Sequence, residues 1–340
     1  MKALLKLKPE KGLWLQDVPL PTIQDDEVLI KIKTIALCGT DLHIYRWDGW
    51  AQKHIETPLI IGHEFIGEIA AIGKRVTHLS VGERVSGEGH ITCGHCRNCR
   101  EGQQHLCPNT IGIGIQRNGA FAEYLALPAR NVIPIPPALS DDVATILDPL
   151  GNAVHTALKF DLVGEDVLIT GAGPIGLMAT AIAKQIGAKN IVVTDLNDYR
   201  LKLAKDFGAT KTINIQDLSL TQILSALGKS FDFTVGLEMS GHIFAYQLML
   251  ESLSYGAHLA LLGIPEQELS LDFNKIIFKG LTLKGIYGRK MFETWDKMIH
   301  LLESGLKISH VITHHFKAKA FEQAFAKIGS GEAGKIILSW

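Results

Sequence analysis

The chain has 340 residues, of which 46% are hydrophobic and 33 are glycine, and this length is enough for two domains with large cores. Its formal net charge of −1 argues against nucleic acid or an anionic membrane surface as a partner. No apolar run reaches the roughly 18 residues of a transmembrane helix. We therefore expect a soluble globular protein that binds neither nucleic acid nor a membrane.

The first third of the chain contains short β-type runs, such as residues 28–33 and 65–72, separated by proline and glycine. Runs of this kind predict an irregular, mostly antiparallel β domain. Residues 1–11 mix lysines with an apolar segment that is too short for the core of a secretory leader. We therefore expect a cytoplasmic protein, whose thiols stay reduced.

Cys38 lies apart from the other four cysteines, directly before a Gly-Thr-Asp segment. A lone cysteine is usually a small buried apolar side chain, but His63, Glu64 and Asp148 offer an imidazole and two carboxylates as partners. Catalytic zinc takes about three protein ligands and leaves one position open. Cys38 and His63 are therefore predicted ligands. The third is Glu64 or Asp148, because strand neighbours point to opposite faces unless the chain bends.

The remaining cysteines form one cluster in the sequence, C-x2-C-x2-C with a fourth cysteine eight positions later: Cys93, Cys96, Cys99 and Cys107. Four thiolates at this spacing can wrap around Zn²⁺ as a closed structural site. Disulfides would compete, but a reducing compartment disfavours them. An iron–sulfur cluster is the other alternative, because closely spaced cysteines serve both groups. Zinc is the favoured prediction.

From about residue 161 the pattern changes to apolar strands that alternate with amphipathic helices. Strands are predicted at residues 166–170 and 190–195, and helices at residues 174–186 and 198–207. Such alternation is typical of a parallel, doubly wound sheet. Further strands are expected later in the chain, at residues 233–237, 258–262 and 282–287.

Gly171, Gly173 and Gly176 form a G-x-G-x-x-G motif between a predicted strand and the next helix. The glycines let the backbone approach a pyrophosphate, whose charge the helix N-terminus stabilises. Asp195 ends the following strand, where an acid accepts hydrogen bonds from the ribose of a dinucleotide. Asp195 would repel the 2′-phosphate of NADP, so NAD is the predicted cofactor. Arg200 could hold such a phosphate, but packing against the adenosine or lying on a solvated helix face fits its place better.

In this order, the Cys38 segment, the Gly-His-Glu segment, the cysteine cluster and the dinucleotide motif resemble the zinc-containing medium-chain dehydrogenases along essentially the whole chain. The resemblance implies an α/β protein with two domains. A GroES-like, β-rich catalytic domain with a structural zinc lobe would cover residues 1–150. A Rossmann-type NAD-binding domain would cover residues 151–292, and residues 293–340 would return to the catalytic domain.

The resemblance also implies roles for the candidate metal ligands. Cys38, His63 and Glu64 would bind a catalytic zinc, and Asp148 would lie beside that metal. The four clustered cysteines would bind a structural zinc. Two zinc ions per chain are therefore expected.

For the proton and the cofactor, the resemblance implies two further sets of residues. Thr40 and His43 would form a proton relay, which suits their spacing, since a hydroxyl both donates and accepts and an imidazole titrates near physiological pH. NAD would contact a wider set of positions, namely Ile175, Asp195, Arg200, Leu262, Gly263, Ile264, Ile286 and Tyr287.

Three segments indicate a particular subgroup of this family, namely residues 88–99, 148–157 and 285–295. They resemble the same segments of family members that oxidise L-threonine at C3. This implies zinc-dependent oxidation by NAD⁺ to 2-amino-3-ketobutyrate, which a 2-amino-3-ketobutyrate CoA ligase would cleave to glycine. It also implies a homotetramer. Apolar strands expected near residues 273–283 could supply a sheet edge that pairs between subunits.

Two other functions fit parts of the sequence. A polyol dehydrogenase of sorbitol or butanediol type would keep the fold and the chemistry, and no residue identifies a group that would bind an amino-acid carboxylate. A non-catalytic zinc- and nucleotide-binding protein, or a zinc-free reductase relative, forms a third class. Cys38, His63 and Thr40 argue against this class, because a binding module has no use for an open metal site together with a relay.

Overall fold

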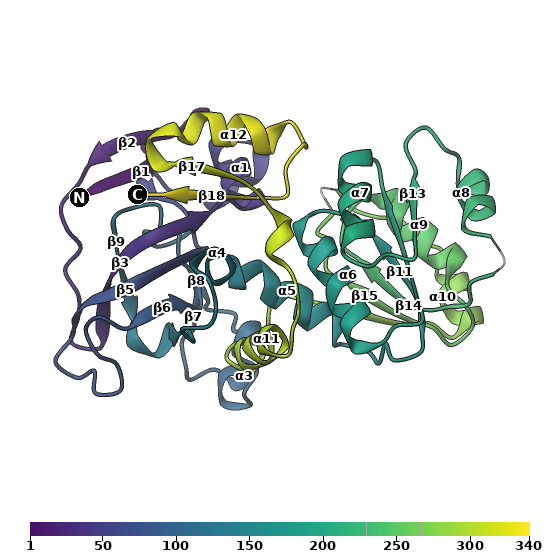
Figure 1. Cartoon of the computed structure of the whole chain (residues 1–340), viewed down its shortest axis with the longest axis horizontal. Helices are drawn as coiled ribbons and strands as arrows, with labels where there is room; N and C mark the ends of the chain where they lie inside the picture. Colours follow the sequence, from purple (N-terminus) through teal and green to yellow (C-terminus); the bar gives the residue numbers. More distant parts are fainter. Residues whose placement is uncertain (229, 266) are drawn as a thin grey trace. The chain divides into compact units, whose positions relative to one another are not determined.

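The computed structural model describes residues 1–228, 230–265 and 267–340. Contacts between residues divide the chain into two compact units, Met1–Asp148 with Ile312–Trp340, and Pro149–Val311. Figure 1 shows the ribbon coloured along the sequence, with the yellow C-terminal strands in the same unit as the purple N-terminal ones. The last segment of the chain therefore returns to the unit in which the chain begins.

A seven-stranded sheet forms the centre of the first unit. Its order is β10 (Val132–Pro134), β6 (Arg84–Gly87), β5 (Phe65–Ile72), β3 (Glu27–Ala36), β18 (Lys335–Ser339) and β17 (Ile312–Lys317), and β9 (Tyr124–Pro128) also pairs with β3. The pairs are antiparallel except for β17 with β18. The prediction of a mostly antiparallel β domain is confirmed.

Strand β3 organises this sheet, because it pairs with β5, β9 and β18. It is rich in β-branched residues, which suit a pleated strand, and Val28, Ile30 and Ile35 are fully buried. The register of β18 on β3 places Ile337 opposite Ala36. Residues from both ends of the sequence thus share one hydrophobic core.

Smaller elements complete the first unit. One sheet contains β2 (Trp14–Asp17), β1 (Lys2–Lys6) and β4 (Leu59–Ile60), and another contains β7 (His90–Ile91) and β8 (Ile111–Gly112). The helices are α1 (Gly39–Arg46), α2 (Gly49–His54), α3 (Arg97–Arg100), α4 (Asp141–Thr145) and α12 (Phe321–Gly329), with 3₁₀ turns η1 (Gln104–Leu106), η2 (Ala129–Asn131) and η4 (Ala318–Ala320). Helix α5 (Leu147–Ala157) begins in this unit and continues into the second.

The second unit contains a parallel six-stranded sheet. Its order is β13 (Lys211–Asn214), β12 (Asn190–Asp195), β11 (Asp166–Thr170), β14 (Phe233–Glu238), β15 (His258–Leu261) and β16 (Thr282–Gly285). Helices follow the strands, namely α6 (Pro174–Ile186), α7 (Asp198–Asp206), α8 (Leu220–Leu227), α9 (Ile243–Ser252) and α10 (Phe273–Lys279). The strand order reverses between β12 and β14, on either side of β11, which is the switch point where doubly wound sheets bind ligands.

Helix α6 shows why the local sequence predicted this fold well. Pro174 occupies its first turn, where the missing amide proton costs nothing, and Gly187 ends it with φ +100°, a conformation that favours glycine. Strand β11 before it is buried at every position. The predicted strands 166–170 and 190–195 and the predicted helix 174–186 match β11, β12 and α6.

The prediction of apolar strands near residues 273–283 is wrong for the first part of this segment. Asp272 caps a helix there by accepting a hydrogen bond from Asn274, and Gly280 ends that helix, α10, with φ +61°. The strand β16 begins only at Thr282. The apolar residues of this segment thus recur on a helix rather than along a strand, so their pattern did not identify the element.

Helix α11 (Glu293–Glu303) and the 3₁₀ turn η3 (Ser309–Val311) lie in the second unit. Trp295 and Met298 of α11 are buried, and the guanidinium group of Arg289 lies 5.8 Å from the Trp295 ring centroid. Gln185 of α6 donates a hydrogen bond to the Leu301 carbonyl. We expected the chain to return to the first unit at residue 293. These contacts place α11 in the second unit, and the chain returns to the first unit only after Val311.

Among the described residues, none of the helices combines the length and the apolar character that spanning a lipid bilayer requires.

Candidate active site

Three potential metal ligands meet in the first unit: Cys38, His63 and Glu64 each offer an atom within 4.8 Å of the others. Cys38 follows β3 and is the N-cap of α1. His63 and Glu64 lie between β4 and β5, directly after Gly62, which has φ +91°. A Cβ atom at Gly62 would also lie 1.9 Å from the Phe121 ring. His63 and Glu64 thus lie outside the strands, where the alternation of side chains along a strand does not keep them apart.

Asp148 was the other candidate for the third ligand. It is 8% exposed and close enough to influence the charge of His63, but among the described residues the group that could hold a metal contains Glu64 and not Asp148. Asp148 therefore lies beside the cluster in this structure, and Glu64 lies in it.

The cluster has the donor atoms that zinc prefers: a thiol, an imidazole and a carboxylate. His63 Nδ1 is buried without a hydrogen-bond partner, although buried polar atoms are normally paired. Burial disfavours a charge on His63, but Cys38, Asp41 and Asp148 outweigh it and hold its pKa at about 10. The site therefore attracts a cation at this position, and its residues fit a zinc ion.

Lys335 is a residue of this site that the sequence did not reveal. Its Nζ donates to both oxygens of Glu64, at 2.5 and 2.6 Å, and to the Leu37 carbonyl at 3.0 Å. Burial opposes its charge, but Glu64 and Cys38 outweigh burial and raise the pKa of Lys335 above the ordinary value. Lys335 thus neutralises a carboxylate that is only 1% exposed.

Asp41 is a second residue that sequence reasoning missed. It is fully buried, and its Oδ2 accepts a hydrogen bond from the Cys38 amide at 2.8 Å. Burial raises its pKa, against the opposing charge of His63. The spacing of Asp41 three residues after the N-cap Cys38 is that of a capping box, and this signal could have found it. Asp41 thus holds the backbone at Cys38, and its charge helps to raise the pKa of His63.

The two predicted relay residues lie on α1. The Thr40 hydroxyl is 3.8 Å from Cys38 Sγ, next to the metal cluster. The His43 side chain is one turn further along and 47% exposed. The helix therefore places a hydroxyl beside the cluster and an imidazole near the surface, which suits a path for protons to solvent.

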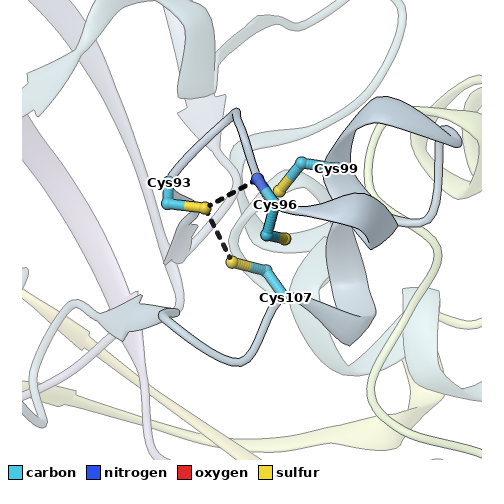
Figure 2. Close-up of side chains that lie close together, drawn as sticks. All are labelled: Cys93, Cys96, Cys99 and Cys107. Carbon is cyan, nitrogen blue, oxygen red and sulfur yellow. Dashed lines mark hydrogen bonds between the residues drawn. The ribbon is translucent and has the colours of Figure 1, made fainter.

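The four clustered cysteines also converge, as Figure 2 shows. Their sulfur atoms lie within 4.8 Å of one another, and Cys93 and Cys107 approach to 3.6 Å, well beyond a disulfide bond length. The amide of Cys96 donates to Cys93 Sγ at 3.4 Å. Amide groups of His95 and Cys96 lower the pKa of the Cys93 thiol to about 6. Four sulfur atoms that converge in this way fit a closed zinc site.

A cavity of about 450 Å³ lies in the second unit beside the carboxyl ends of β11 and β12. It is lined by Gly171, Gly173, Asp195 and Arg200, and by residues that the sequence did not single out, namely Thr170, Thr194, Leu196, Ile215, Leu218, Met239, Ser240, His242, Phe244 and Ala245. Its position at the switch point of the sheet is where doubly wound folds hold dinucleotides.

The glycine motif is shaped for close approach of a ligand. A Cβ atom at Gly176 would lie 2.0 Å from the Gly171 carbonyl oxygen, whereas one at Gly173 would have no atom within 4 Å. Gly176 thus allows close packing of helix on strand, and Gly173 leaves open space. Both oxygens of Asp195 accept backbone hydrogen bonds, from Ala172 at 2.6 Å and Asn197 at 2.9 Å, which holds the carboxylate at the cavity wall.

The other predicted cofactor residues do not line this cavity. Ile175 lies in the first turn of α6, Leu262, Gly263 and Ile264 follow β15, and Ile286 and Tyr287 follow β16. Ile264 is 83% and Tyr287 is 56% exposed. These positions lie at or just beyond the carboxyl ends of neighbouring strands, and their role remains a prediction. Glu238, which the sequence did not single out, holds this loop region by accepting hydrogen bonds from Ser240 and Gly241.

Comparison with known proteins gives matches along the whole chain. The family described as "Alcohol dehydrogenase GroES-like domain" matches residues 24–137, and "Zinc-binding dehydrogenase" matches residues 174–304. Proteins named L-threonine 3-dehydrogenase from Shewanella sp. (strain W3-18-1) and Shewanella baltica (strain OS155 / ATCC BAA-1091) are 58% identical to the chain, over 100% of both sequences.

Solved structures share the fold. Galactitol-1-phosphate dehydrogenase from Escherichia coli has a TM-score of 0.91 and 31% identity, over 100% of each chain. A protein described as a short chain alcohol dehydrogenase from E. coli CFT073, complexed with NADH, has a TM-score of 0.91 and 30% identity, over 100% of this chain and 99% of that one. These matches confirm the predicted combination of a GroES-like and a Rossmann-type fold. The chain belongs to the zinc-containing medium-chain alcohol dehydrogenase family.

Proposed function

We propose that this protein oxidises the C3 hydroxyl group of L-threonine with NAD⁺, which yields 2-amino-3-ketobutyrate and NADH. The observation that carries the proposal is the 58% identity, over full length, with relatives named L-threonine 3-dehydrogenase. The cluster of Cys38, His63 and Glu64 supports metal-assisted oxidation of an alcohol. The cavity at Asp195 supports a dinucleotide as the hydride acceptor.

Cys38, His63 and Glu64 would hold the catalytic zinc, with Asp148 beside it, and the four clustered cysteines would hold a structural zinc. A zinc ion bound by Cys38, His63 and Glu64 acts as a Lewis acid that lowers the pKa of the substrate hydroxyl. Lys335 and Asp41 support this site from behind, since Lys335 contacts Glu64 and Asp41 accepts from the Cys38 amide.

Thr40 and His43 would carry the released proton to solvent. The Thr40 hydroxyl can accept a proton from the substrate and donate its own, and it lies beside the cluster. His43 is half exposed, and an imidazole nitrogen can accept a proton and donate it again. The relay thus leads from the buried cluster toward water along one face of α1.

The proposal is tested by measuring NADH formation with L-threonine, L-serine, sorbitol and 2,3-butanediol, on protein whose zinc content has been determined. We expect rapid turnover with L-threonine alone. A polyol substrate is the second candidate, because a structural relative at 31% identity is a galactitol-1-phosphate dehydrogenase. Turnover confined to a polyol would replace the threonine proposal and keep the metal sites.

Asp195→Ala is expected to weaken NAD⁺ binding by about 1–3 kcal/mol, through loss of charge-assisted hydrogen bonds to the ribose, and to narrow the preference over NADP⁺. Calorimetric titration of both cofactors measures this. Asp198→Ala is the matched control, because Asp198 is a nearby acid of α7 that hydrogen-bonds Asn214 and does not line the cavity. An unchanged cofactor preference in Asp195→Ala would remove this residue from the proposed site.

We also propose a homotetramer, in which β16 pairs with a second copy of the chain. Within the described residues β16 ends its sheet and has β15 as its neighbour, and an unpaired edge is a template for another strand. Apolar side chains nearby in the sequence are exposed, namely Ile264, Phe273, Ile277, Phe278 and Tyr287. Exposed apolar residues in such number are typical of an interface.

Phe278→Asp is expected to reduce the assembly to species no larger than a dimer, because a charge on the 78% exposed Phe278 cannot be buried unpaired between subunits. Analytical ultracentrifugation measures the mass. Val163→Asp is the control, since Val163 is 63% exposed in the loop before β11. An unchanged tetramer in Phe278→Asp would exclude this interface.

The cytoplasm is the proposed location, because the clustered cysteines need a reducing compartment to bind metal as thiolates. The product, a β-keto acid with an α-amino group, is chemically unstable, so a 2-amino-3-ketobutyrate CoA ligase is the proposed next enzyme. Coupling would appear as faster glycine formation when both proteins are present.

A further inference from the structure

We propose that Asp48 is a positioning residue for His43: it fixes the proton on Nδ1 of the imidazole and leaves Nε2 as the nitrogen that exchanges protons. The inference rests on the proposed function, in which His43 is the outer member of the relay. Neither the sequence motifs nor the comparisons single out Asp48, which lies in the corner between α1 and α2.

The contact itself is short and direct. His43 Nδ1 lies 2.5 Å from Asp48 Oδ2. The backbone between them turns sharply, because Trp47 has φ +57° and its amide donates to the His43 carbonyl at 2.9 Å. Few non-glycine residues adopt that conformation. The corner therefore folds Asp48 back onto the side chain that lies five positions earlier.

The second oxygen of Asp48 is held by the backbone of α2. Oδ1 accepts hydrogen bonds from the amides of Trp50 and Ala51, both at 3.1 Å, so Asp48 is the N-cap of that helix. With Oδ1 fixed in this way, the carboxylate cannot turn, and Oδ2 stays directed at the imidazole. The Asp48 carboxylate thus caps α2 and orients the His43 ring at the same time.

The charge state of Asp48 determines the direction of the hydrogen bond. Burial opposes its ionisation, but the hydrogen bonds from His43 and from the amides of α2 outweigh burial and lower its pKa. An ionised carboxylate only accepts hydrogen bonds. His43 must therefore donate from Nδ1, and in the neutral ring the proton-free nitrogen is Nε2.

Other groups near α1 leave Asp48 as the specific partner. The elements packed most closely against α1 carry Lys53 and His54 on α2 and Glu322 and Lys327 on α12. Helix α1 itself carries Asp41, Tyr45 and Arg46 besides His43. Lys6 lies over the Trp47 ring. In the part of the chain that the structure describes, Asp48 is the residue with a polar atom at hydrogen-bond distance from the His43 ring.

Trp50 limits the ring from a second side. Its ring centroid is 6.0 Å from that of His43, with a tilt of 51°, and it is stacked on His54 at 4.9 Å. His43 is therefore half exposed but not free to take any orientation. A relay imidazole needs this, because a proton passes only to a nitrogen that faces the donor.

The proton balance of the relay follows from this arrangement. In the proposed relay, a proton that leaves the substrate hydroxyl would pass by way of the Thr40 hydroxyl and the ribose of the bound cofactor to Nε2 of His43. The imidazolium then carries both protons, and the carboxylate of Asp48 faces its positive charge. Release of the Nε2 proton to water restores the starting tautomer, so that Nδ1 keeps its proton throughout.

The test uses two substitutions that keep the helix cap and differ at the ring. In Asp48→Asn, the side-chain oxygen can cap α2 while its amide group donates to Nδ1, which inverts the tautomer. In Asp48→Ser, the hydroxyl caps α2 but is too short to hold the ring. Nitrogen NMR of labelled, zinc-loaded protein reads the tautomer of His43 directly, without any substrate.

We expect the wild-type ring to carry its neutral-state proton on Nδ1, Asp48→Asn to carry it on Nε2, and Asp48→Ser to show a mixture. At neutral pH, kcat for L-threonine should fall about tenfold or more in Asp48→Asn and by less in Asp48→Ser. This loss is smaller than the usual contribution of a general acid or base, because His43 itself is still present. The zinc content should stay the same.

A His43→Gln background separates positioning from a structural role. Adding Asp48→Asn to His43→Gln should cost no further activity, because residues that act through one another are not additive. The inference is overturned if Asp48→Asn keeps the wild-type tautomer, or if it lowers kcat equally with and without His43. Absence of threonine turnover in the wild type would contradict the proposed function alone, since the NMR measurement of the tautomer needs no reaction.

Discussion

Cys38→Ser is expected to abolish turnover, by on the order of a thousandfold or more in kcat/KM, since the Lewis acid supplies several kcal/mol of the stabilisation that the reaction needs. The reason is the small donor set: Cys38 provides the thiolate among the three atoms that converge within 4.8 Å. A serine hydroxyl is a much poorer zinc ligand than a thiolate. Zinc content should fall from about two ions per chain to about one.

Cofactor binding should survive in Cys38→Ser, because Cys38 lies in the first unit and the cavity at Asp195 lies in the second. The matched variant is Cys107→Ser, which changes the other cluster. It should also remove about one zinc ion but lower the thermal stability strongly, since a closed zinc site contributes folding energy. Loss of both metals in Cys38→Ser, or retained activity, would contradict two separate metal sites.

Lys335→Met is expected to lower the free energy of unfolding of the zinc-free protein by about 3–5 kcal/mol, because it leaves a buried carboxylate without its partner. Glu64 is 1% and Lys335 is 3% exposed, and the two groups are joined by two hydrogen bonds. Zinc should recover part of the loss by neutralising Glu64. Urea unfolding with and without zinc measures both effects.

Two controls isolate the buried ion pair. Lys327→Met removes an exposed pair, in which Lys327 is 3.0 Å from Glu332, and should change stability by less than about 1 kcal/mol. Adding Glu64→Gln to Lys335→Met should restore part of the lost stability, since the cost lies in the unpaired charge. If Lys335→Met lowers the free energy of unfolding no more than Lys327→Met does, the buried pair contributes little to stability.

The sequence predicted best what neighbouring residues determine. The strand β11, the helix α6 and the strand β12 were placed at their observed bounds, because apolar periodicity and glycine positions act within a few residues. The four clustered cysteines were also identified from spacing alone, since one short loop brings them together. In residues 273–283 the local signal failed, because apolar residues in a short segment fit a helix and a strand equally well.

The tertiary structure decided which distant groups meet. Sequence reasoning left Glu64 and Asp148 as alternatives for the third ligand, and the irregular segment between β4 and β5 places Glu64 in the cluster with Cys38 and His63. Lys335 reaches Glu64 from 271 positions away only because β18 pairs with β3. The sequence by itself thus determined the family, the strands and helices with strong patterns, and the local metal cluster. The charge balance of the cluster of Cys38, His63 and Glu64 depends on Lys335. Strand pairing between the two ends of the chain brings Lys335 there, and no local pattern encodes that pairing.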